Sequence, residues 1–560
     1  MRVRTWQSRG TGKGRIRGGA IAAALLVGVA IAISLNSMGA DGPRVGPLQR
    51  FLRSAPSKRM AARSRTAPAE PVSQPAEAPT GFNNSTNGLV SQADFDADRK
   101  TFEEVDTILP ETEDNGEESG GGLGPVYNST SCVACHQNPV TGSSSQISEL
   151  RAGMKIDGKF VEPLGGSLIH QRTIDAAAQE RVLPEFNVRT LRMSTTTLGD
   201  GFVEVIPDSV ILDVLNSEPT DLKGYAVPVP VVVSGTINAD GSFTFNLVER
   251  LGRFGWKCQE ASLINFAAGA YINEIGITNP LNPKENKSNG RDVSQFDQVL
   301  DPEDKVDKHK DRPFGDDVNA FAEFMRATKA PPRDFSLANT DDVKAGELLF
   351  NDTTTGAKKL GCAVCHHPCY TTPPAGTPIV VTGTKQPASD LPGSVVPAAL
   401  GNKMIHPYSD FLLHDIGTGD GIAQTQHAQR PPRGVDNLKR AEYPTGEQAH
   451  ILRVGRTPRR KAAATSDSKK EGGSDQCPPV ISEEELDQNT ADKIRTAPLW
   501  GLRVRPQLLH DGTALTIEDA IIRHIVNQAG PGPSNVQLPG NYQALTNDQK
   551  RQLKAFLNSL

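Results

Sequence analysis

The chain has 560 residues, which at roughly 150 residues per domain is enough for two to four domains with their own cores. It carries 60 basic and 65 acidic residues, but 13 of the basic ones lie in residues 1–66, so the rest of the chain is acidic. An acidic body excludes nucleic-acid binding through a basic surface, and seven cysteines exclude a disulfide-rich scaffold of this length.

The N-terminus joins a basic segment to an apolar one. Six Lys or Arg residues between Arg2 and Arg17 precede the apolar run Ala20–Leu35. This layout predicts a secretory signal peptide or a short N-terminal membrane anchor over residues 1–40. Residues 41–100 start rich in Pro, Ser and Ala and are predicted to be a flexible tether. Either form of leader exports the chain, so we expect a periplasmic or exported protein, with inner-membrane anchoring as one alternative.

Residues 200–250 are the part of the chain with the strongest β signal. The runs VEVI, VILDVL and VPVPVVVSGTI are rich in Val and Ile, which favours strands. Pro228 and Pro230 cannot donate to a neighbouring strand, so they restrict their strand to a sheet edge. Residues Asn238–Gly241 predict a hairpin turn before the next strand.

Helices are predicted mainly in the second half of the chain. Residues 316–329 have the apolar spacing of a helix, and Thr340 is placed to cap the helix that follows it. Thr546 with Gln549 predicts a capping box at the start of a C-terminal helix. Residues 457–480 are of low complexity and are predicted to be a surface insertion.

Two motifs of the form CxxCH lie at residues 132–136 and 362–366. Two cysteines one helical turn apart, followed directly by a histidine, are typical of covalent c-type haem: the thiols bond to the haem and the imidazole binds its iron. Zinc would need four closed ligands, which neither motif completes, and a redox-active CxxC pair does not explain both histidines. The sequence therefore predicts two covalently bound c-type haems, held by Cys132, Cys135, His136, Cys362, Cys365 and His366.

The other three cysteines have no assigned partner. Cys369 and Cys477 could form a disulfide, but spacing alone cannot fix connectivity. Cys258 would then be left over. Three unpaired thiols are the plain alternative.

The two motifs and the segments around them resemble the superfamily of di-haem cytochrome c peroxidases and MauG-type enzymes, in particular the branch labelled di-haem oxidoreductase or thiol oxidoreductase. The resemblance implies a mainly α fold with two cytochrome c-like haem domains facing each other, a β-rich insertion and long loops. We accordingly expect an N-terminal haem domain over residues 101–330 and a C-terminal haem domain over residues 331–560. The resemblance rests on the blocks Gly122–His136, Arg253–Leu281, Gly346–His366, Ile405–Gly417 and Arg495–His524.

The resemblance also implies roles for two single residues. The family has a Trp between its haems and a Glu near the first haem, and these positions fall on Trp256 and Glu274. Trp256 is thus the candidate electron relay, and Glu274 the candidate acid–base group for peroxide. The alternatives are that Trp256 is a core aromatic residue and that Glu274 is an ordinary carboxylate at the end of a helix. The Gln that the peroxidase pattern has ten residues after the Trp is absent, because Phe266 stands there.

Further iron ligands are implied in the same way. The far ligand of the second haem lies fourteen residues after the His of an HDG motif, and this count from His510 reaches His524. His524 opposite His366 would give a bis-His haem of lower potential than a Met ligand would. The first candidate far ligand for the first haem is His170, which ligates, gates or does neither. The superfamily often holds calcium through backbone carbonyls, and Thr496 matches one such position.

Three functions are consistent with these residues. The first is an exported peroxidase-type oxidoreductase, in which electrons from a small redox donor protein enter at the His366 haem and cross by way of Trp256. Peroxide or another small oxidant is then reduced at the His136 haem. The second is a non-catalytic electron carrier with both irons six-coordinate. The third is oxidation of thiols or of a partner protein's side chains, as the family label suggests.

Overall fold

The computed structural model describes residues 74–560, except for 111, 115–116, 238–242, 300–313, 353–359, 380–394, 426–440, 443–485 and 525–537. These residues belong to one compact unit, Val72–Leu560. The predicted leader, most of the tether, the hairpin turn at 238–241, the 457–480 insertion and Cys477 lie outside the described residues. Among the described residues, no helix is long and apolar enough to cross a bilayer.

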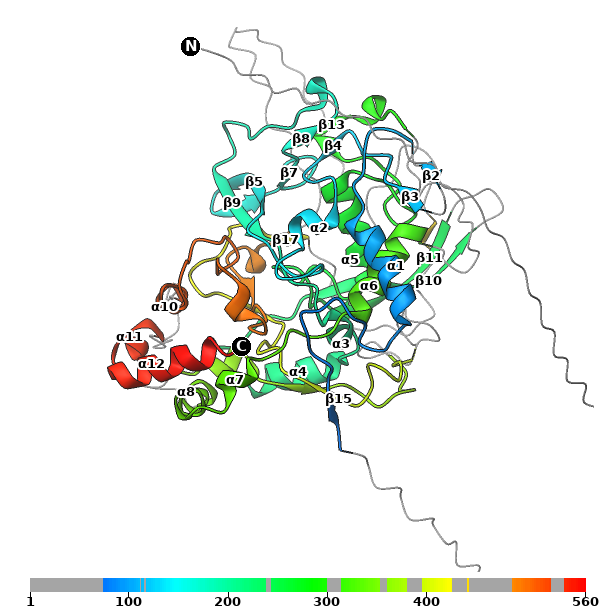
Figure 1. The fold of residues 1–560 in the computed structure, drawn as a ribbon. Helices are drawn as coiled ribbons and strands as arrows, with labels where there is room; N and C mark the ends of the chain where they lie inside the picture. The colour runs from blue at the N-terminus through cyan, green and yellow to red at the C-terminus, as the bar shows by residue number, and fades with distance from the viewer. Residues whose placement is uncertain are drawn as a thin grey trace, which may run out of the picture. The chain divides into compact units, whose positions relative to one another are not determined.

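The prediction of a mainly α fold is wrong. Helices account for 30% of the residues and strands for 19%, and the strands form several small sheets (Figure 1). Much of the chain between the two CxxCH motifs has the β-branched content or the two-residue alternation that stabilises strands, so it does not form cytochrome-like helices.

A four-stranded sheet follows the first CxxCH motif. Its central strand β5 pairs antiparallel with β6, β7 and β9. Asp157 and Gly158 both have positive φ in the β5–β6 turn, as a tight two-residue hairpin requires. Glu149 on β5 pairs directly with Arg192 on β9, so their side chains share one face of the sheet. The strands are β5 Ser148–Ile156, β6 Lys159–Val161, β7 Leu168–Ile169 and β9 Val188–Met193.

The second half of the predicted β region forms a long hairpin. Strands β10 (Pro228–Ile237) and β11 (Phe243–Leu251) pair antiparallel. β10 lies at the edge of its sheet, which confirms the expectation from Pro228 and Pro230.

The first half of that region is helical instead. Residues there form α3 (Asp200–Glu204) and α4 (Asp208–Ser217). In α4, Ile211 and Val214 are both buried and lie three residues apart, so the apolar content serves one helix face. Val and Ile content alone therefore predicted the wrong element.

The first CxxCH motif forms α2 (Cys132–Cys135), and three helices lie around it: α1 (Gln92–Glu103), α5 (Leu263–Ala270) and α6 (Asp316–Ala327). The α6 bounds confirm the helix predicted over 316–329. Phe95 and Phe102 of α1 pack on Phe324 of α6, with ring centres 5.3 and 4.8 Å apart. This aromatic cluster packs next to α2. The π-helical turn η2 (Tyr271–Ile275) continues α5.

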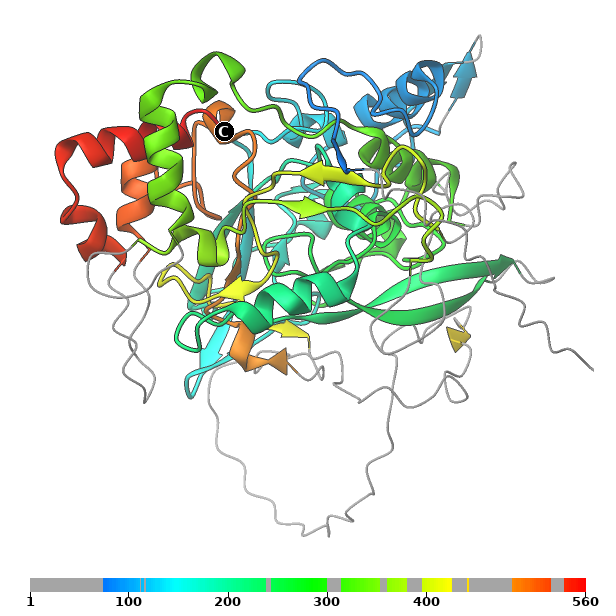
Figure 2. The same ribbon diagram turned by 90° about the horizontal axis from the view of Figure 1, so that it is seen from below.

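A second helical group surrounds the second motif, and both predicted caps are confirmed. Thr340 caps the helix that it precedes, and Thr546 with Gln549 forms the capping box. Gly346 lets two of these helices approach closely, since an added Cβ there would lie 2.0 Å from the carbonyl of Gln552. Figure 2 shows the red C-terminal helix beside green α8. The helices are α7 Phe335–Ala338, α8 Asp341–Asn351, α9 Cys362–Cys365, α10 Ile517–Ile522, α11 Leu538–Gln543 and α12 Asn547–Leu557.

Short strands and 3-10 turns join segments that are far apart in the chain, such as β1 with β15 and β16 with β20. The short strands are β1 Ala76–Glu77, β2 Thr112–Asp114, β3 Glu117–Ser119, β4 Val126–Tyr127, β8 Arg172–Thr173, β12 Lys287–Ser288, β13 Arg291–Asp292, β14 Tyr370–Thr371, β15 Lys403–Ile405, β16 Leu413–His414, β17 Gln424–Thr425, β18 Ala441–Glu442, β19 Leu486–Asp487 and β20 Ile494–Arg495. The 3-10 turns are η1 Ala176–Ala178, η3 Ser294–Phe296, η7 Gln488–Thr490 and η8 Leu502–Val504.

Candidate functional site

The second CxxCH motif forms the short helix α9, and His366 follows at its C-terminal end. The Nδ1–H of His366 donates to the carbonyl of Tyr408 at 2.9 Å. Because a carbonyl can only accept, Nδ1 carries the proton and Nε2 keeps its lone pair for a metal. Burial, followed by the nearby His524, lowers the pKa of His366 to about 4, so its ring is neutral at pH 7.

His524 faces His366 from the end of α10. Its Nδ1–H donates to the carbonyl of Ala520 at 2.6 Å, which again leaves Nε2 free. The two ring centres lie 6.4 Å apart. Two imidazoles on one metal have ring centres roughly 6 Å apart, since each metal–nitrogen bond is about 2.0 Å long. The pair therefore fits an iron held by two histidines, and the structure brings these predicted site residues together.

A cavity of about 370 Å³ lies beside this pair. Its walls include Cys362 and Cys365, the apolar side chains of Phe350 and Leu502, and Trp256. The cavity continues to the segments Ser144–Ser145 and Met193–Thr196. The backbone groups of Ser143 and Thr195, which bond to the His136 ring, belong to these segments or adjoin them. One cavity thus joins the second motif to the wall of the first.

The first CxxCH motif repeats the arrangement of the second. Helix α2 ends at Cys135, and the following His136 donates its Nδ1–H to the carbonyl of Ser143 at 3.1 Å. Phe102 packs edge-on against the imidazole, with ring centres 6.1 Å apart. Burial lowers the pKa of His136. The neutral ring therefore also presents Nε2 to a metal.

Glu274 lies in η2, against the segment that leads into the first motif. Its backbone carbonyl accepts N–H groups from Asn128 and Ser129, and its carboxyl accepts from Asn128 Nδ2 at 3.1 Å. The carboxylate also lies near enough to Cys135 to contribute, after burial, to raising the pKa of that thiol to about 11. Burial, followed by the charge of Glu149, raises the pKa of Glu274 to about 8. This carboxyl is therefore protonated at neutral pH.

His170 is buried at the end of β7, with 1% of its surface exposed. Its Nδ1 bonds to the Glu180 carboxylate at 2.8 Å, and the same carboxylate accepts the His170 backbone N–H. Within the described part of the chain, Nε2 has no hydrogen-bond partner. His170 is thus oriented in the way that metal-binding histidines are, by a carboxylate on the other ring nitrogen.

Trp256 lies between the two motifs, on the wall of the shared cavity. Its indole N–H donates to the carbonyl of Met193 at 2.7 Å. Its ring packs edge-to-face on His510, with ring centres 6.2 Å apart. The indole is therefore fixed in orientation on this wall.

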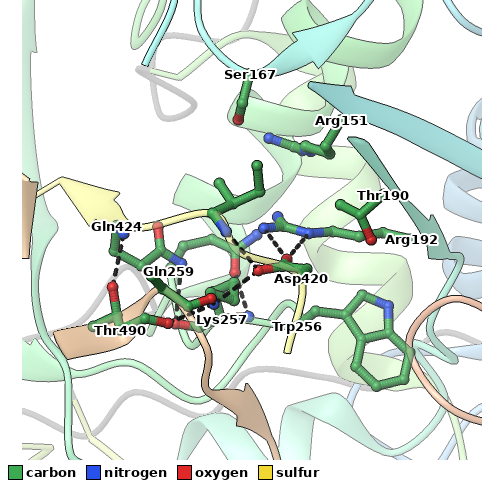
Figure 3. A network of polar contacts seen from close by, with 12 residues as sticks. Arg151, Ser167, Thr190, Arg192, Trp256, Lys257, Gln259, Asp420, Gln424 and Thr490 are labelled. Carbon is green, nitrogen blue, oxygen red and sulfur yellow. Dashed lines mark hydrogen bonds and ion pairs between the residues drawn. The ribbon is translucent and has the colours of Figure 1, made fainter. Parts of the chain in front are cut away.

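A buried ionic network lies next to Trp256 (Figure 3). Lys257, the next residue, places Nζ 3.0 Å from one oxygen of Asp420. The other Asp420 oxygen accepts two bonds from Arg192, which directly precedes Met193. The residue after Trp256 and the residue before its acceptor Met193 thus bind the same carboxylate. The Lys257 ammonium also donates to the carbonyls of Thr490, Ala491 and Lys493.

One comparison with known proteins covers the second of these two sites. A sequence model of the family described as "di-haem oxidoreductase, putative peroxidase" matches residues 170–430, which contain the second motif, Trp256 and Glu274. The resemblance to the di-haem oxidoreductases is thereby confirmed. The family name implies haem cofactors and an oxidoreductase.

No curated protein matches the chain. Among solved structures, hydrazine synthase of Kuenenia stuttgartiensis, pressurised with xenon, is similar over 93% of this chain and 100% of its own. The identity is 14% and the TM-score 0.31, values too low to support any conclusion on fold or activity.

Calcium, which di-haem peroxidases often hold, stays a prediction at Thr496. The Thr496 carbonyl accepts a hydrogen bond from the Ser409 hydroxyl at 2.6 Å. Among the described residues, the Cys, His, Asp and Glu side chains close enough to share an ion are Cys365, Asp410 and His414. Their sulfur and nitrogen atoms do not suit calcium, which prefers oxygen ligands.

Outside the two CxxCH motifs, the cysteines that the structure describes, Cys258 and Cys369, are free thiols. Cys258 is buried and donates its S–H to the carbonyl of Phe411 at 3.2 Å, and Cys369 is exposed. The pairing of Cys369 with Cys477 is untested, because Cys477 lies outside the described residues.

The sequence analysis missed the charged residues that surround Trp256 and Glu274. Glu149 and Arg151 stand two residues apart in SELRAGMKI, a spacing that puts both on one face of a strand. That alternation was the available signal. Asp420 stands in a loop without any pattern, and only the fold brings it to Lys257.

Proposed function

We propose that this chain is an exported di-haem oxidoreductase of the peroxidase type. The observation that carries the proposal is the position of Trp256 in the cavity that runs from the His366–His524 pair to the segment beside His136. When bound, covalent haems at the two motifs would take electrons from a small redox protein at the second motif and deliver them to peroxide at the first.

The chain's own residues would hold the two haems in different ways. Cys362 and Cys365 would attach the second, and His366 and His524 would bind its iron. Cys132 and Cys135 would attach the first, and His136 would bind its iron. The Nδ1–carbonyl hydrogen bonds support this assignment, since they fix each ring with Nε2 unprotonated.

Glu274 is proposed to hold and move the proton that peroxide reduction needs. A carboxyl protonated at neutral pH can donate to an oxygen as it departs and then regain a proton from water. Its hydrogen bond from Asn128 keeps the carboxyl beside the first motif. Trp256 would be the relay between the two sites, fixed by Met193 and His510.

Export is supported by the basic and apolar leader in residues 1–40 and by the requirement of bacterial c-type haem for attachment outside the cytoplasm. A small redox protein as electron donor follows from the family pattern. An inner-membrane anchor remains the alternative form of the same leader.

A second candidate function is electron transfer without catalysis. His170 favours it, because a buried Nε2 without a partner would be satisfied by binding the first iron. Such a ligand would close the site to peroxide, so the two functions differ in the coordination of the first iron.

The test is a set of optical and EPR spectra of the haem-loaded full chain. Spectra are taken for the oxidised and the one-electron-reduced protein, each before and after stoichiometric hydrogen peroxide. A high-spin first haem that reacts with peroxide supports the peroxidase proposal, and Glu274→Gln should then slow the reaction by about 100-fold or more. Two low-spin haems that ignore peroxide in both states contradict it. If His170→Ala converts one of them to high spin, the electron carrier is established.

A further inference from the structure

Glu274 has a second carboxyl as its neighbour. Glu149, on β5, forms a side-chain hydrogen bond with Glu274. Two carboxyl groups can share a hydrogen bond only when one of them is protonated.

The sheet determines which member of the pair is ionised. Arg151 lies two residues along β5 and places Nε 2.7 Å from Glu149 Oε1. Arg192 stands opposite Glu149 on β9. The Glu274 carboxyl accepts a hydrogen bond from the neutral side-chain amide of Asn128. The cations therefore hold Glu149 as the carboxylate, and Glu274 keeps the proton.

We propose that Glu149 is a positioning residue that shares a proton with Glu274 and keeps Glu274 loaded as the acid of the first site. The inference rests on the proposed function, in which Glu274 delivers that proton. In the resting pair, the Glu274 O–H donates to the Glu149 carboxylate. After Glu274 has passed its proton to the departing oxygen, two neighbouring anions remain, and their repulsion favours uptake of a proton from water by Glu274.

Other charged groups near the pair come from three strands. Arg172 on β8 lies near Cys135, and Arg192 on β9 is shared with Asp420. The imidazole of His170, after β7, bonds to Glu180 instead of the pair. Burial and the Glu149 charge act in the same direction on Glu274, whose pKa is raised to about 8, whereas Arg151 opposes them. The pKa of Glu149 is lowered by Arg151 against the effect of burial.

The experiment follows the infrared absorption of the protonated carboxyl in the haem-loaded chain as a function of pH. Loss of a band in Glu274→Gln assigns that band to Glu274. In the wild type the band should titrate near pH 8. In Glu149→Gln its midpoint should fall by about one unit or more, because the anionic neighbour is removed. Glu149→Asp keeps the charge and should retain the high midpoint, which separates the effect of charge from that of misfolding.

Glu162→Gln is the matched control. Glu162 lies near Arg151, as Glu149 does, and its carboxylate accepts the backbone N–H of Ser167. In this variant, the midpoint of the Glu274 band should equal that of the wild type. An unchanged midpoint in Glu149→Gln, or an equal fall in Glu162→Gln, would overturn the inference. A lowered midpoint in Glu149→Gln together with no peroxide reaction in the wild type would sustain proton sharing and refute the proposed function instead.

Discussion

The indole N–H of Trp256 donates to the carbonyl of Met193 at 2.7 Å, so a strand of the four-stranded sheet determines the orientation of the candidate relay. The same strand carries Arg192, which binds Asp420 and thereby Lys257. The relay position is therefore supported by the β structure that distinguishes this chain from a pair of helical cytochrome domains.

Replacing Trp256 by Phe should slow electron transfer between the two haem sites and lower stability by about 1 kcal/mol, because the Met193 carbonyl loses its donor. Rapid-mixing spectroscopy after one-electron reduction and thermal unfolding measure the two effects. Trp500→Phe is the matched control. The buried Trp500 indole N–H has no partner among the described residues, so its removal should not destabilise. Equal transfer rates in both variants would contradict the relay role.

His524→Met should raise the reduction potential of the second haem, since a thioether ligand favours the reduced iron more than a second imidazole does. Spectroelectrochemical titration of the loaded protein gives the potential, and the optical spectrum reports the ligand change. His406→Met serves as control, because His406 is exposed and contacts Glu77 instead of the cavity. If His524→Met and His406→Met have the same potential, His524 is not a ligand.

Lys257→Met should destabilise the protein by about 3 to 5 kcal/mol, because it removes a buried cation that pairs with Asp420 and donates to backbone carbonyls. Lys329→Met is a suitable comparison, since the partly buried Lys329 ammonium donates to the Ser85 hydroxyl. Chemical unfolding curves of both variants and the wild type give the difference. A loss below about 1 kcal/mol for Lys257→Met would show that the network does not stabilise the fold.

Gly346→Ala should destabilise by about 1 to 3 kcal/mol, because the added methyl would overlap the carbonyl of Gln552 and push α8 from α12. Gly269→Ala, in α5, is the control. Its added Cβ would meet only Glu260 Oε1, at 4.0 Å, and helix propensity should make that variant up to about 1 kcal/mol more stable. Thermal unfolding measures the stability change in both variants. If both variants are destabilised, or both are stabilised, the close approach of α8 and α12 at Gly346 is refuted.

The stability of the protein should depend on pH through Glu260. Burial raises the pKa of Glu260 to about 8, compared with about 4.3 for an unperturbed Glu. The folded state thus binds more protons between these values, so the contribution of Glu260 is complete below about pH 4 and is lost as the pH rises to about 8. Glu260→Gln should therefore gain more in unfolding temperature, relative to the wild type, at pH 8 than at pH 5. An equal difference at both values would disprove this linkage.

The parts of the structure that could be predicted are those that short segments determine. The caps at Thr340 and Thr546 depend on residues three positions away, and Pro228 excludes a central strand by itself. His524 was found by a family count, and the structure places it opposite His366.

The parts that could not be predicted depend on residues distant in the chain. Asp420 is drawn to Lys257 and Arg192 by the fold, and no local pattern marks it. The strand β5 looks polar because Glu149 and Arg151 form an ion pair on one of its faces, so the usual rule of one apolar face does not identify it. The expectation of a mainly α fold came from the family resemblance, which did not reveal these strands.

The carbonyls that receive the Lys257 ammonium belong to residues 490–493, near the end of the chain. A ribosome makes residue 257 long before those carbonyls exist, and a chain released in N-to-C order must wait for them. The segment around Lys257 therefore reaches its final packing only after residues 490–493 have been made. In a truncated product that ends after the first half, the Lys257 ammonium would lack these carbonyls and Asp420, so this segment would not reach its native packing.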